Sequence, residues 1–349
     1  MKLKKIKTKI IAGALTLSVF GGLLTGCDNG TLFGGPSSNP DSAGGKKTIN
    51  VYSTAEDFRN ENARNMLKEK FPEYKINLID ISTGSLSAKL AAETPSDTDI
   101  DIILELETSY LERFSDKLAT LDSVDFSVYL DEYVPASHKY TPWIFLSGAV
   151  IVNKTMLAEK GAAIPTSYDD LLKPEYKGLI SMPNPKTSGT GYIFLLNLVN
   201  ARGQDAAFEY FDKLTENIAG QGYPTSGSGP INALVQREAA IGLGMTFQAV
   251  TENNNGSDFE IIWFDEGAPY CTYSSAVIEG KEKDEDVMKV FNYIVSDVSP
   301  ADKKLFFFEK VFKEQETTVK NYPENIKYGD MKGLNDMDLK ESLLDKWNH

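Results

Sequence analysis

The chain has 349 residues, with 36 basic and 50 acidic side chains and a formal net charge of −14. This acidic balance argues against nucleic acid as a partner, because proteins that bind nucleic acid carry basic patches. Two cysteines and two histidines are too few for a zinc cluster, and no P-loop, GxSxG or HExxH motif occurs. The composition favours binding over catalysis, so we expect no enzymatic activity, no cofactor and no metal.

Residues 1–26 have the pattern of a secretory signal peptide. Five lysines among the first nine residues precede an uncharged stretch over 10–24, which is shorter than the about 20 apolar residues of a membrane span. The stretch ends in Leu-Thr-Gly-Cys, which resembles the lipobox of bacterial lipoproteins. We expect residues 1–26 to be removed and Cys27 to carry the lipid. The alternative is a buried cysteine after an ordinary signal or a short membrane anchor.

Residues 27–47 are rich in Gly, Ser, Pro and Asn. A segment of this composition buries too little apolar surface to order itself, so we expect a flexible tether. Such a tether holds a folded body close to the outer face of a membrane. We therefore expect a lipid-anchored protein on the extracytoplasmic side of the cell membrane.

Strands and helices alternate in the first part of the folded body. Strands are expected over residues 48–52, 74–82 and 99–107. This βαβαβ rhythm predicts an α/β fold with a mainly parallel sheet and helices on both faces. Ligands bind outside the carboxyl ends of the strands in such sheets, and Ser53, Thr54, Gly84 and Ser85 fall at that edge.

A second α/β series begins near residue 148. Strands are expected over residues 148–154, 179–185, 240–247, 259–264 and 274–280. The restart of the rhythm predicts two lobes, each a mainly parallel sheet flanked by helices. We expect residues 48–145 and 275–349 to form lobe one and residues 146–274 to form lobe two. The last 50 residues have a helical, amphipathic pattern.

Four turns rich in glycine and hydroxyl side chains lead into helices, two in each half. Beside the two turns named above, they lie at residues 187–190 and 226–228. A helix N-terminus with free amides and hydroxyls binds anions, and two facing lobes with such rims form a cleft for a small polar solute. We expect Ser188, Gly189 and Thr190 to hold the anionic end of that solute. A plain helix cap is the alternative at each turn.

Four segments carry a resemblance to a known family. In chain order they read PWIFLSGAVIVNK, PTSYDDLLKPEYKGLISMPNPKTSGTGY, REAAIGLG and DEGAPY. They resemble the solute-binding lipoproteins of bacterial ABC importers, in the group that includes ferric-iron, thiamine, 2-aminoethylphosphonate and hexose-phosphate binders. The resemblance covers roughly residues 48–300. It implies a two-lobed periplasmic-binding-protein-like fold of type II and a monomer that closes on its solute and delivers it to permease and ATPase subunits.

The resemblance leaves the solute open. Ferric-iron binders of this group present a pair of tyrosines shortly after the EAAIG strand, whereas residues 245–250 read MTFQAV here. The hydroxyl and glycine turns suit a phosphonate or phosphate ester, with Glu105, Glu107, Asp265 and Glu266 available for hydroxyls or an ammonium on the ligand. Ferric iron is the alternative ligand. An enzyme on the same scaffold, with Cys271 as nucleophile, is the alternative from another class.

The candidate ligand-binding residues are Ser53, Thr54, Gly84, Ser85, Ser188, Gly189, Thr190, Ser226, Gly227, Ser228, Gln248, Glu266 and Tyr270. Most of them belong to the four turns, and the last three follow the strands of the second series. Together they define the predicted cleft between the two lobes.

Overall fold

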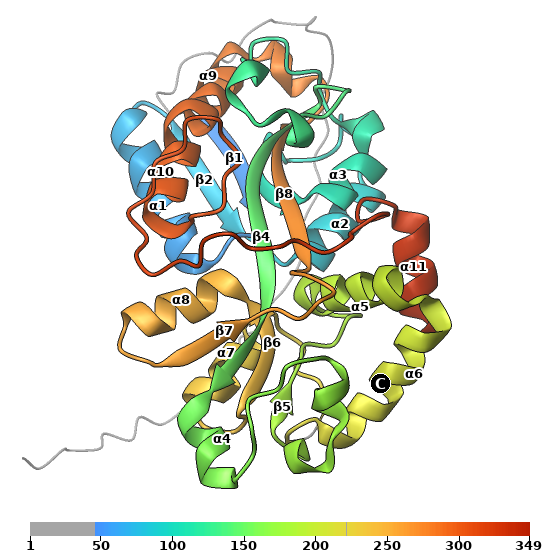
Figure 1. The fold of residues 1–349 in the computed structure, drawn as a ribbon. Helices are drawn as coiled ribbons and strands as arrows, with labels where there is room; N and C mark the ends of the chain where they lie inside the picture. Colours follow the sequence, from blue (N-terminus) through green and yellow to red (C-terminus); the bar gives the residue numbers. More distant parts are fainter. Residues whose placement is uncertain (1–45, 221) are drawn as a thin grey trace, which may run out of the picture. The chain divides into compact units, whose positions relative to one another are not determined.

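The computed structural model describes residues 46–220 and 222–349 (Figure 1). The predicted signal peptide over 1–26 and the predicted lipid on Cys27 lie outside the described residues, as does nearly all of the predicted tether over 27–47. None of the described helices is long and apolar enough to cross a membrane.

The first sheet section has the predicted βαβαβ order. Its elements are β1 (Thr48–Ser53), α1 (Asp57–Lys70), β2 (Lys75–Asp80), α2 (Thr83–Ala92), β3 (Ile102–Glu107) and α3 (Thr108–Arg113). β1 lies between β2 and β3 and is parallel to both. The carboxyl ends of β1 and β3 therefore lie side by side at one edge of the sheet.

Two strands far apart in the sequence form the centre of the sheet, β4 (Tyr140–Asn153) and β8 (Tyr270–Val277). β4 pairs with β8 over residues 140–147 and with β6 and β7 over residues 148–153. Hydrogen bonding thus continues through β4 in the order β2-β1-β3-β8-β4-β6-β5, and β4 crosses from one section to the other (Figure 1). β4 is buried at all 14 positions, as its apolar run requires.

The sheet is mixed, whereas the sequence predicts mainly parallel sheets. β8 is antiparallel to β3 and β4, and β4 is antiparallel to β6 and β7. The reason is that β4 and β8 serve both sections and run against the strands of the βαβ units. The parallel pairs are β1 with β2, β1 with β3, and β5 with β6.

The second sheet section surrounds the lower half of β4 in Figure 1. Its elements are α4 (Lys154–Lys160), β5 (Ile180–Ser181), α5 (Gly189–Arg202), α6 (Gln204–Leu214), α7 (Gly229–Val235), β6 (Ile241–Met245), α8 (Thr246–Asn254) and β7 (Phe259–Ile262). α5 is buried from Thr190 to Leu198, so it is a core helix. A methyl group at Gly191 would lie 2.4 Å from the carbonyl oxygen of Pro183, so only glycine permits this close packing.

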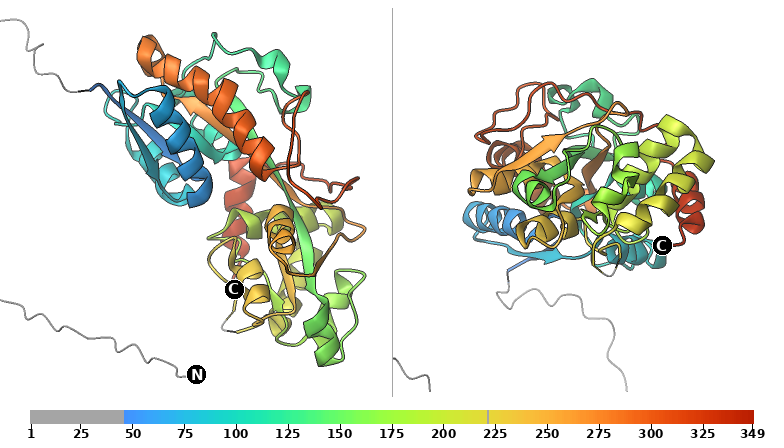
Figure 2. Two further views of the ribbon diagram at one scale, coloured as in Figure 1. Left: turned by 90° about the vertical axis from the view of Figure 1, so that its left-hand side faces the viewer. Right: turned by 60° about the horizontal axis from the view of Figure 1, so that its bottom comes forward.

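The chain then returns to the first section and ends against the second. α9 (Glu285–Tyr293) continues through a π-turn (Ile294–Val298) into α10 (Ser299–Phe306), which lies beside α1 (Figure 2). Residues 307–336 form no helix, and the last helix is α11 (Met337–Lys346). The fully buried Trp347 packs on Phe211 of α6. The division into two lobes stays a prediction. Residues 275–349 are assigned to lobe one, yet the C-terminal residues contact the second sheet section.

Short 3₁₀ turns connect these elements at Ser115–Lys117, Phe126–Val128, Asp131–Tyr133, Asp169–Leu172, Pro174–Tyr176, Thr215–Asn217 and Lys281–Lys283. The largest buried apolar cluster extends through both sections, from Ile49 of β1 to Trp347 after α11. Packing through the shared strands thus joins the two sections in one core.

Candidate functional site

The N-terminus of α5 presents unsatisfied polar groups. Ser188 is the N-cap residue, yet its side chain makes no capping hydrogen bond. Ser188 and Thr190 are 8% and 6% exposed, and neither hydroxyl has a hydrogen-bond partner within residues 46–220 and 222–349. The amides of Gly189, Thr190 and Gly191 likewise meet no acceptor in the described chain. Capping therefore does not explain these hydroxyls, and the helix end has free donors for an anion.

The turn before α7 meets the N-terminus of α5. A methyl group at Gly227 would lie 2.6 Å from Oγ1 of Thr190 and 3.3 Å from Oγ of Ser188. Two of the four predicted turns therefore come together here, and a larger residue at position 227 would have to displace the Thr190 side chain. The hydroxyls of Ser226 and Ser228 are 2.9 Å apart and bond to each other. We call this group of residues, Ser188, Gly189, Thr190 and Gly227, the α5 mouth.

The carboxyl end of β3 reaches the same place from the first section. Oε2 of Glu107 would lie 3.3 Å from a methyl group at Gly189, and the hydroxyl of Tyr273 would lie 3.6 Å from it. Oε1 of Glu107 accepts hydrogen bonds from Nζ of Lys340 at 2.5 Å and from Oγ of Ser109 at 2.7 Å. Both sections therefore contribute to the α5 mouth.

Lys340 on α11 is a charged residue that the sequence reading missed. It is 3% exposed, and its Nζ lies 4.7 Å from the ring centres of Tyr110 and Tyr192. Burial lowers the pKa of Lys340, but Glu107 more than compensates, so the pKa is raised overall and the lysine stays protonated. The sequence offers one indication that Lys340 is buried, because it lies on the same face of α11 as the buried Leu343.

The turns after β1 and β2 use their hydroxyls locally. Oγ of Ser53 accepts from the amide of Ala55, and the hydroxyl of Thr54 donates to the carbonyl oxygen of Glu105 at 3.1 Å. Ser82 caps α2 by accepting from the amide of Ser85 at 3.2 Å. Gly84 and Ser85 lie within the first turn of α2 rather than before it. At these two turns the capping and turn-forming roles account for the hydroxyls.

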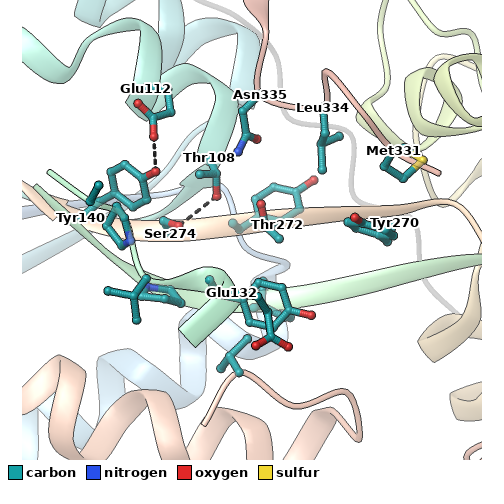
Figure 3. Close-up of a pocket in the computed structure, with 18 of the residues that line it drawn as sticks. Thr108, Glu112, Glu132, Tyr140, Tyr270, Thr272, Ser274, Met331, Leu334 and Asn335 are labelled. Atoms are coloured by element: carbon teal, nitrogen blue, oxygen red, sulfur yellow. Dashed lines mark hydrogen bonds between the residues drawn. The ribbon is translucent and has the colours of Figure 1, made fainter. Parts of the chain in front are cut away.

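The last three candidates lie in different surroundings. Oε1 of Gln248, in the first turn of α8, is buried without a hydrogen-bond partner among the described residues. Glu266 pairs with Arg202 at 2.6 Å, at the opposite end of α5 from the α5 mouth. Tyr270 lines a cavity of about 540 Å³ whose lining does not include Ser188 or Thr190 (Figure 3). The structure thus does not gather Glu266 and Tyr270 with Ser188 and Thr190.

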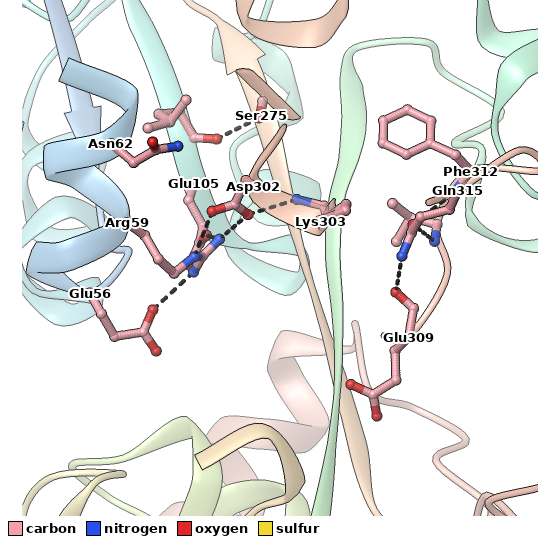
Figure 4. A network of polar contacts seen from close by, with 12 residues as sticks. Glu56, Arg59, Asn62, Glu105, Ser275, Asp302, Lys303, Glu309, Phe312 and Gln315 are labelled. Atoms are coloured by element: carbon pink, nitrogen blue, oxygen red, sulfur yellow. Dashed lines mark hydrogen bonds and ion pairs between the residues drawn. The ribbon is translucent and has the colours of Figure 1, made fainter. Parts of the chain in front are cut away.

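A buried ionic cluster fixes the strand end that leads to Glu107 (Figure 4). Arg59 contacts Glu105 at 2.7 Å and Asp302 at 2.9 Å, and Lys303 contacts Asp302 at 3.0 Å. Burial raises the pKa of Glu105 and lowers the pKa of Lys303 to about 8. Glu105 and Glu107 are two residues apart on β3, so this cluster anchors the segment that carries Glu107.

Cys271 does not offer the reactive thiol that a cleft enzyme needs. The side chain is 2% exposed, and burial raises the pKa of its thiol well above the ordinary value. The thiolate is the nucleophilic form of cysteine, so this thiol is held in its unreactive form.

Residues 99–312 match the family model of the bacterial extracellular solute-binding proteins. The chain belongs to this family. An uncharacterized protein of Haemophilus influenzae is 27% identical over 248 residues, which are 68% of this chain and 70% of that protein. The spermidine/putrescine-binding periplasmic protein of Salmonella typhimurium is 23% identical over 188 residues, and the match spans 51% of each chain. The chain is thus a solute-binding protein.

Solved structures confirm the predicted periplasmic-binding-protein-like α/β fold. The periplasmic binding protein AfuA from Actinobacillus pleuropneumoniae, with fructose-6-phosphate bound, has a TM-score of 0.75 and 21% identity; the match covers 87% of this chain and 98% of that one. Iron-bound HitA from Pseudomonas aeruginosa has a TM-score of 0.73 and 15% identity; the match covers 86% and 98% of the two chains. At such identities the likeness concerns the fold alone.

Proposed function

We propose that this solute-binding protein is the capture component of an ABC importer and holds the anionic end of a phosphate or phosphonate ester at the α5 mouth. The observation that carries the proposal is the pair of hydroxyls on the largely buried residues Ser188 and Thr190, which have no partner within the described chain and lie beside the free amides of α5. Neither hydroxyl oxygen is among the buried unpartnered atoms of the described residues, so both are accessible to a ligand, and an oxyanion there accepts charge-assisted hydrogen bonds from them. AfuA, which shares the fold, is described with a sugar phosphate bound.

The capture cycle follows from the two sheet sections. The α5 mouth receives donors from the second section and the Glu107 side chain from the first, so a solute there touches both. Contacts to both sides favour a closed arrangement of two lobes around β4 and β8, and the closed form docks on the permease and ATPase subunits of the importer. We propose that the protein acts as a monomer on the extracytoplasmic face of the cell membrane.

Removing either hydroxyl should weaken anion binding without lowering stability. Ser188→Ala and Thr190→Ala should each weaken binding of fructose 6-phosphate and of inorganic phosphate about tenfold or more, because a hydrogen bond to a charged group is worth roughly 1.5–3 kcal/mol. The melting temperature of the unliganded variants should stay the same, because neither hydroxyl makes a bond there. Isothermal titration calorimetry and thermal melting measure the two effects.

A matched serine provides the control. Ser82→Ala removes a true helix cap, so it should lower the free energy of unfolding by about 1 kcal/mol and leave the affinities unchanged. If Ser188→Ala lowers the melting temperature and keeps the affinity, the α5 mouth is not the anion site. The same titration with a ferric chelate tests the alternative ligand, since iron bound by phenolates gives a visible charge-transfer band.

We also propose that Cys27 anchors the protein through a lipid. In cells fed a fatty-acid analogue, the full chain and a Cys271→Ala variant should both incorporate label, because Cys271 is buried in the fold. Cys27→Ala should lose the label completely. Label retained in Cys27→Ala would show that the lipid is attached elsewhere, and a full chain without label would show that the N-terminus is an ordinary signal.

A further inference from the structure

We propose that Glu107 selects the anions that the α5 mouth accepts, by requiring an N–H or O–H donor next to their charged oxygens. This inference rests on the anion site proposed above. The substrate class it implies is a phosphate or phosphonate compound that carries a proton on the phosphoryl group or an amino or hydroxyl group beside it. Oxyanions without a donor, such as sulfate, bind more weakly.

The geometry divides the two oxygens of Glu107 between two tasks. Oε1 accepts from both Lys340 and Ser109, which hold the carboxylate in place. Oε2 makes no hydrogen bond within the described residues and points toward Gly189, where a methyl group would lie 3.3 Å from it. A free acceptor thus stands beside the free donors at the N-terminus of α5.

A bare oxyanion at this place faces an acceptor with no proton between them. Glu107 is 4% exposed, so solvent screens this contact poorly. Lys340 balances the charge of the carboxylate through Oε1, but it does not occupy the lone pairs of Oε2. A ligand donor that reaches Oε2 turns the contact into a charge-assisted hydrogen bond.

The expected preference is large enough to measure. A hydrogen bond to a charged group corresponds to a factor on the order of ten to a hundred in affinity. Inorganic phosphate carries a proton near neutral pH, whereas sulfate does not, and the two ions are similar in size. The unchanged protein should therefore bind phosphate at least tenfold more tightly than sulfate.

The test compares these two anions in the full chain and in Glu107→Gln by isothermal titration calorimetry. The variant should reduce the preference for phosphate to threefold or less, because its amide offers sulfate a donor. A second variant, Glu107→Gln with Lys340→Met, avoids leaving Lys340 buried without its partner. It should give the same loss of preference if the single variant folds poorly. A preference that stays tenfold in both variants overturns the role of Glu107.

Two further arms identify the donor and separate this inference from the anion site. Fructose 6-phosphate affinity that falls from pH 5.5 to 8.5 points to a phosphoryl proton, because a phosphate monoester loses its last proton at a pKa of about 6; 2-aminoethylphosphonate affinity that stays constant points to an ammonium. If Ser188→Ala weakens the binding of phosphate and sulfate equally while Glu107→Gln keeps the preference for phosphate, the anion site at the α5 mouth is supported and the role of Glu107 is not. If Ser188→Ala changes neither affinity, or neither anion binds, both proposals fail.

Discussion

Replacing Arg59 with methionine should lower the free energy of unfolding by about 3–5 kcal/mol, because it leaves Glu105 buried without a cation. The Arg59 side chain is 1% exposed and contacts Glu105 at 2.7 Å and Asp302 at 2.9 Å. Asp302 keeps Lys303 as a partner at 3.0 Å, whereas Glu105 keeps no ion-pair partner among residues 46–220 and 222–349. Urea denaturation followed by circular dichroism measures the loss as a lower midpoint at an unchanged slope.

A neighbouring arginine on the same helix serves as the control. Arg64 pairs with Asp80 at 3.2 Å with both side chains about 40% exposed or more, so Arg64→Met should cost less than about 1 kcal/mol. The cost of Arg59→Met should also shrink at acid pH, because burial already raises the pKa of Glu105 and protonation removes the unpaired charge. Equal costs for the two variants would show that the cluster contributes nothing beyond a surface pair.

The first sheet section was predictable because its signals are local. Alternating apolar residues gave strands close to the observed β1, β2 and β3, with helices between them. The mixed character of the whole sheet was not predictable from such patterns. β4 and β8 are separated by the entire second section, and periodicity carries no information on which distant strands pair or in which direction.

The C-terminal segment shows a second limit. Residues 307–336 carry an amphipathic pattern, yet Asn321, Asn325 and Gly333 adopt positive φ angles of 58°, 61° and 82°. These left-handed positions interrupt any helix. The asparagines and the glycine are the sequence signal against a helix here, because both residue types tolerate the left-handed conformation better than other residues.

The candidate site was predicted in parts but not as an assembly. Ser188, Thr190 and Gly227 were identified as members of turns, but their close approach follows from the packing of α5 and α7 on the shared sheet. The pairing of Glu107 with Lys340 joins residues that are 233 positions apart. The sequence shows the two charges and not their contact, so the donor requirement inferred for Glu107 needed the structure.

The unfolding free energy of the wild-type chain should fall as pH rises from 5 to 8, and Glu309→Gln should remove most of this fall. Glu309 is 4% exposed, and burial raises the pKa of its carboxyl from 4.5 to about 7. Oε1 accepts from the amide of Ser147 at 3.0 Å, whereas Oε2 has no hydrogen-bond partner among the described residues. Tyr322, Tyr133, Tyr328 and Cys271 are the titratable groups whose pKa values respond to Glu309, and none of them is a cation.

The sign follows from proton binding. Between pH 4.5 and about 7 the folded chain keeps a proton on Glu309 that the unfolded chain has released. The folded state therefore binds more protons in this window, and its stability decreases as pH rises through about 7, by up to about 3 kcal/mol. Above that pH Glu309 is ionised in both the folded and the unfolded state, and its carboxyl causes no further loss of stability. Urea midpoints at pH 5, 6, 7 and 8 measure the profile.

Glu309 lies where its ionisation affects β4, the strand that both sheet sections share. Its partner Ser147 is the last β4 residue paired with β8, and the hydroxyl of Ser147 bonds to Thr246 of α8 at 2.8 Å. Ionisation of Glu309 therefore places an unpaired charge where β4 passes between the two sheet sections. Glu316→Gln alters an exposed carboxylate of the same segment, so it should not reproduce the change in slope. Parallel pH profiles for wild type and Glu309→Gln would contradict the raised pKa and place that carboxyl in contact with water.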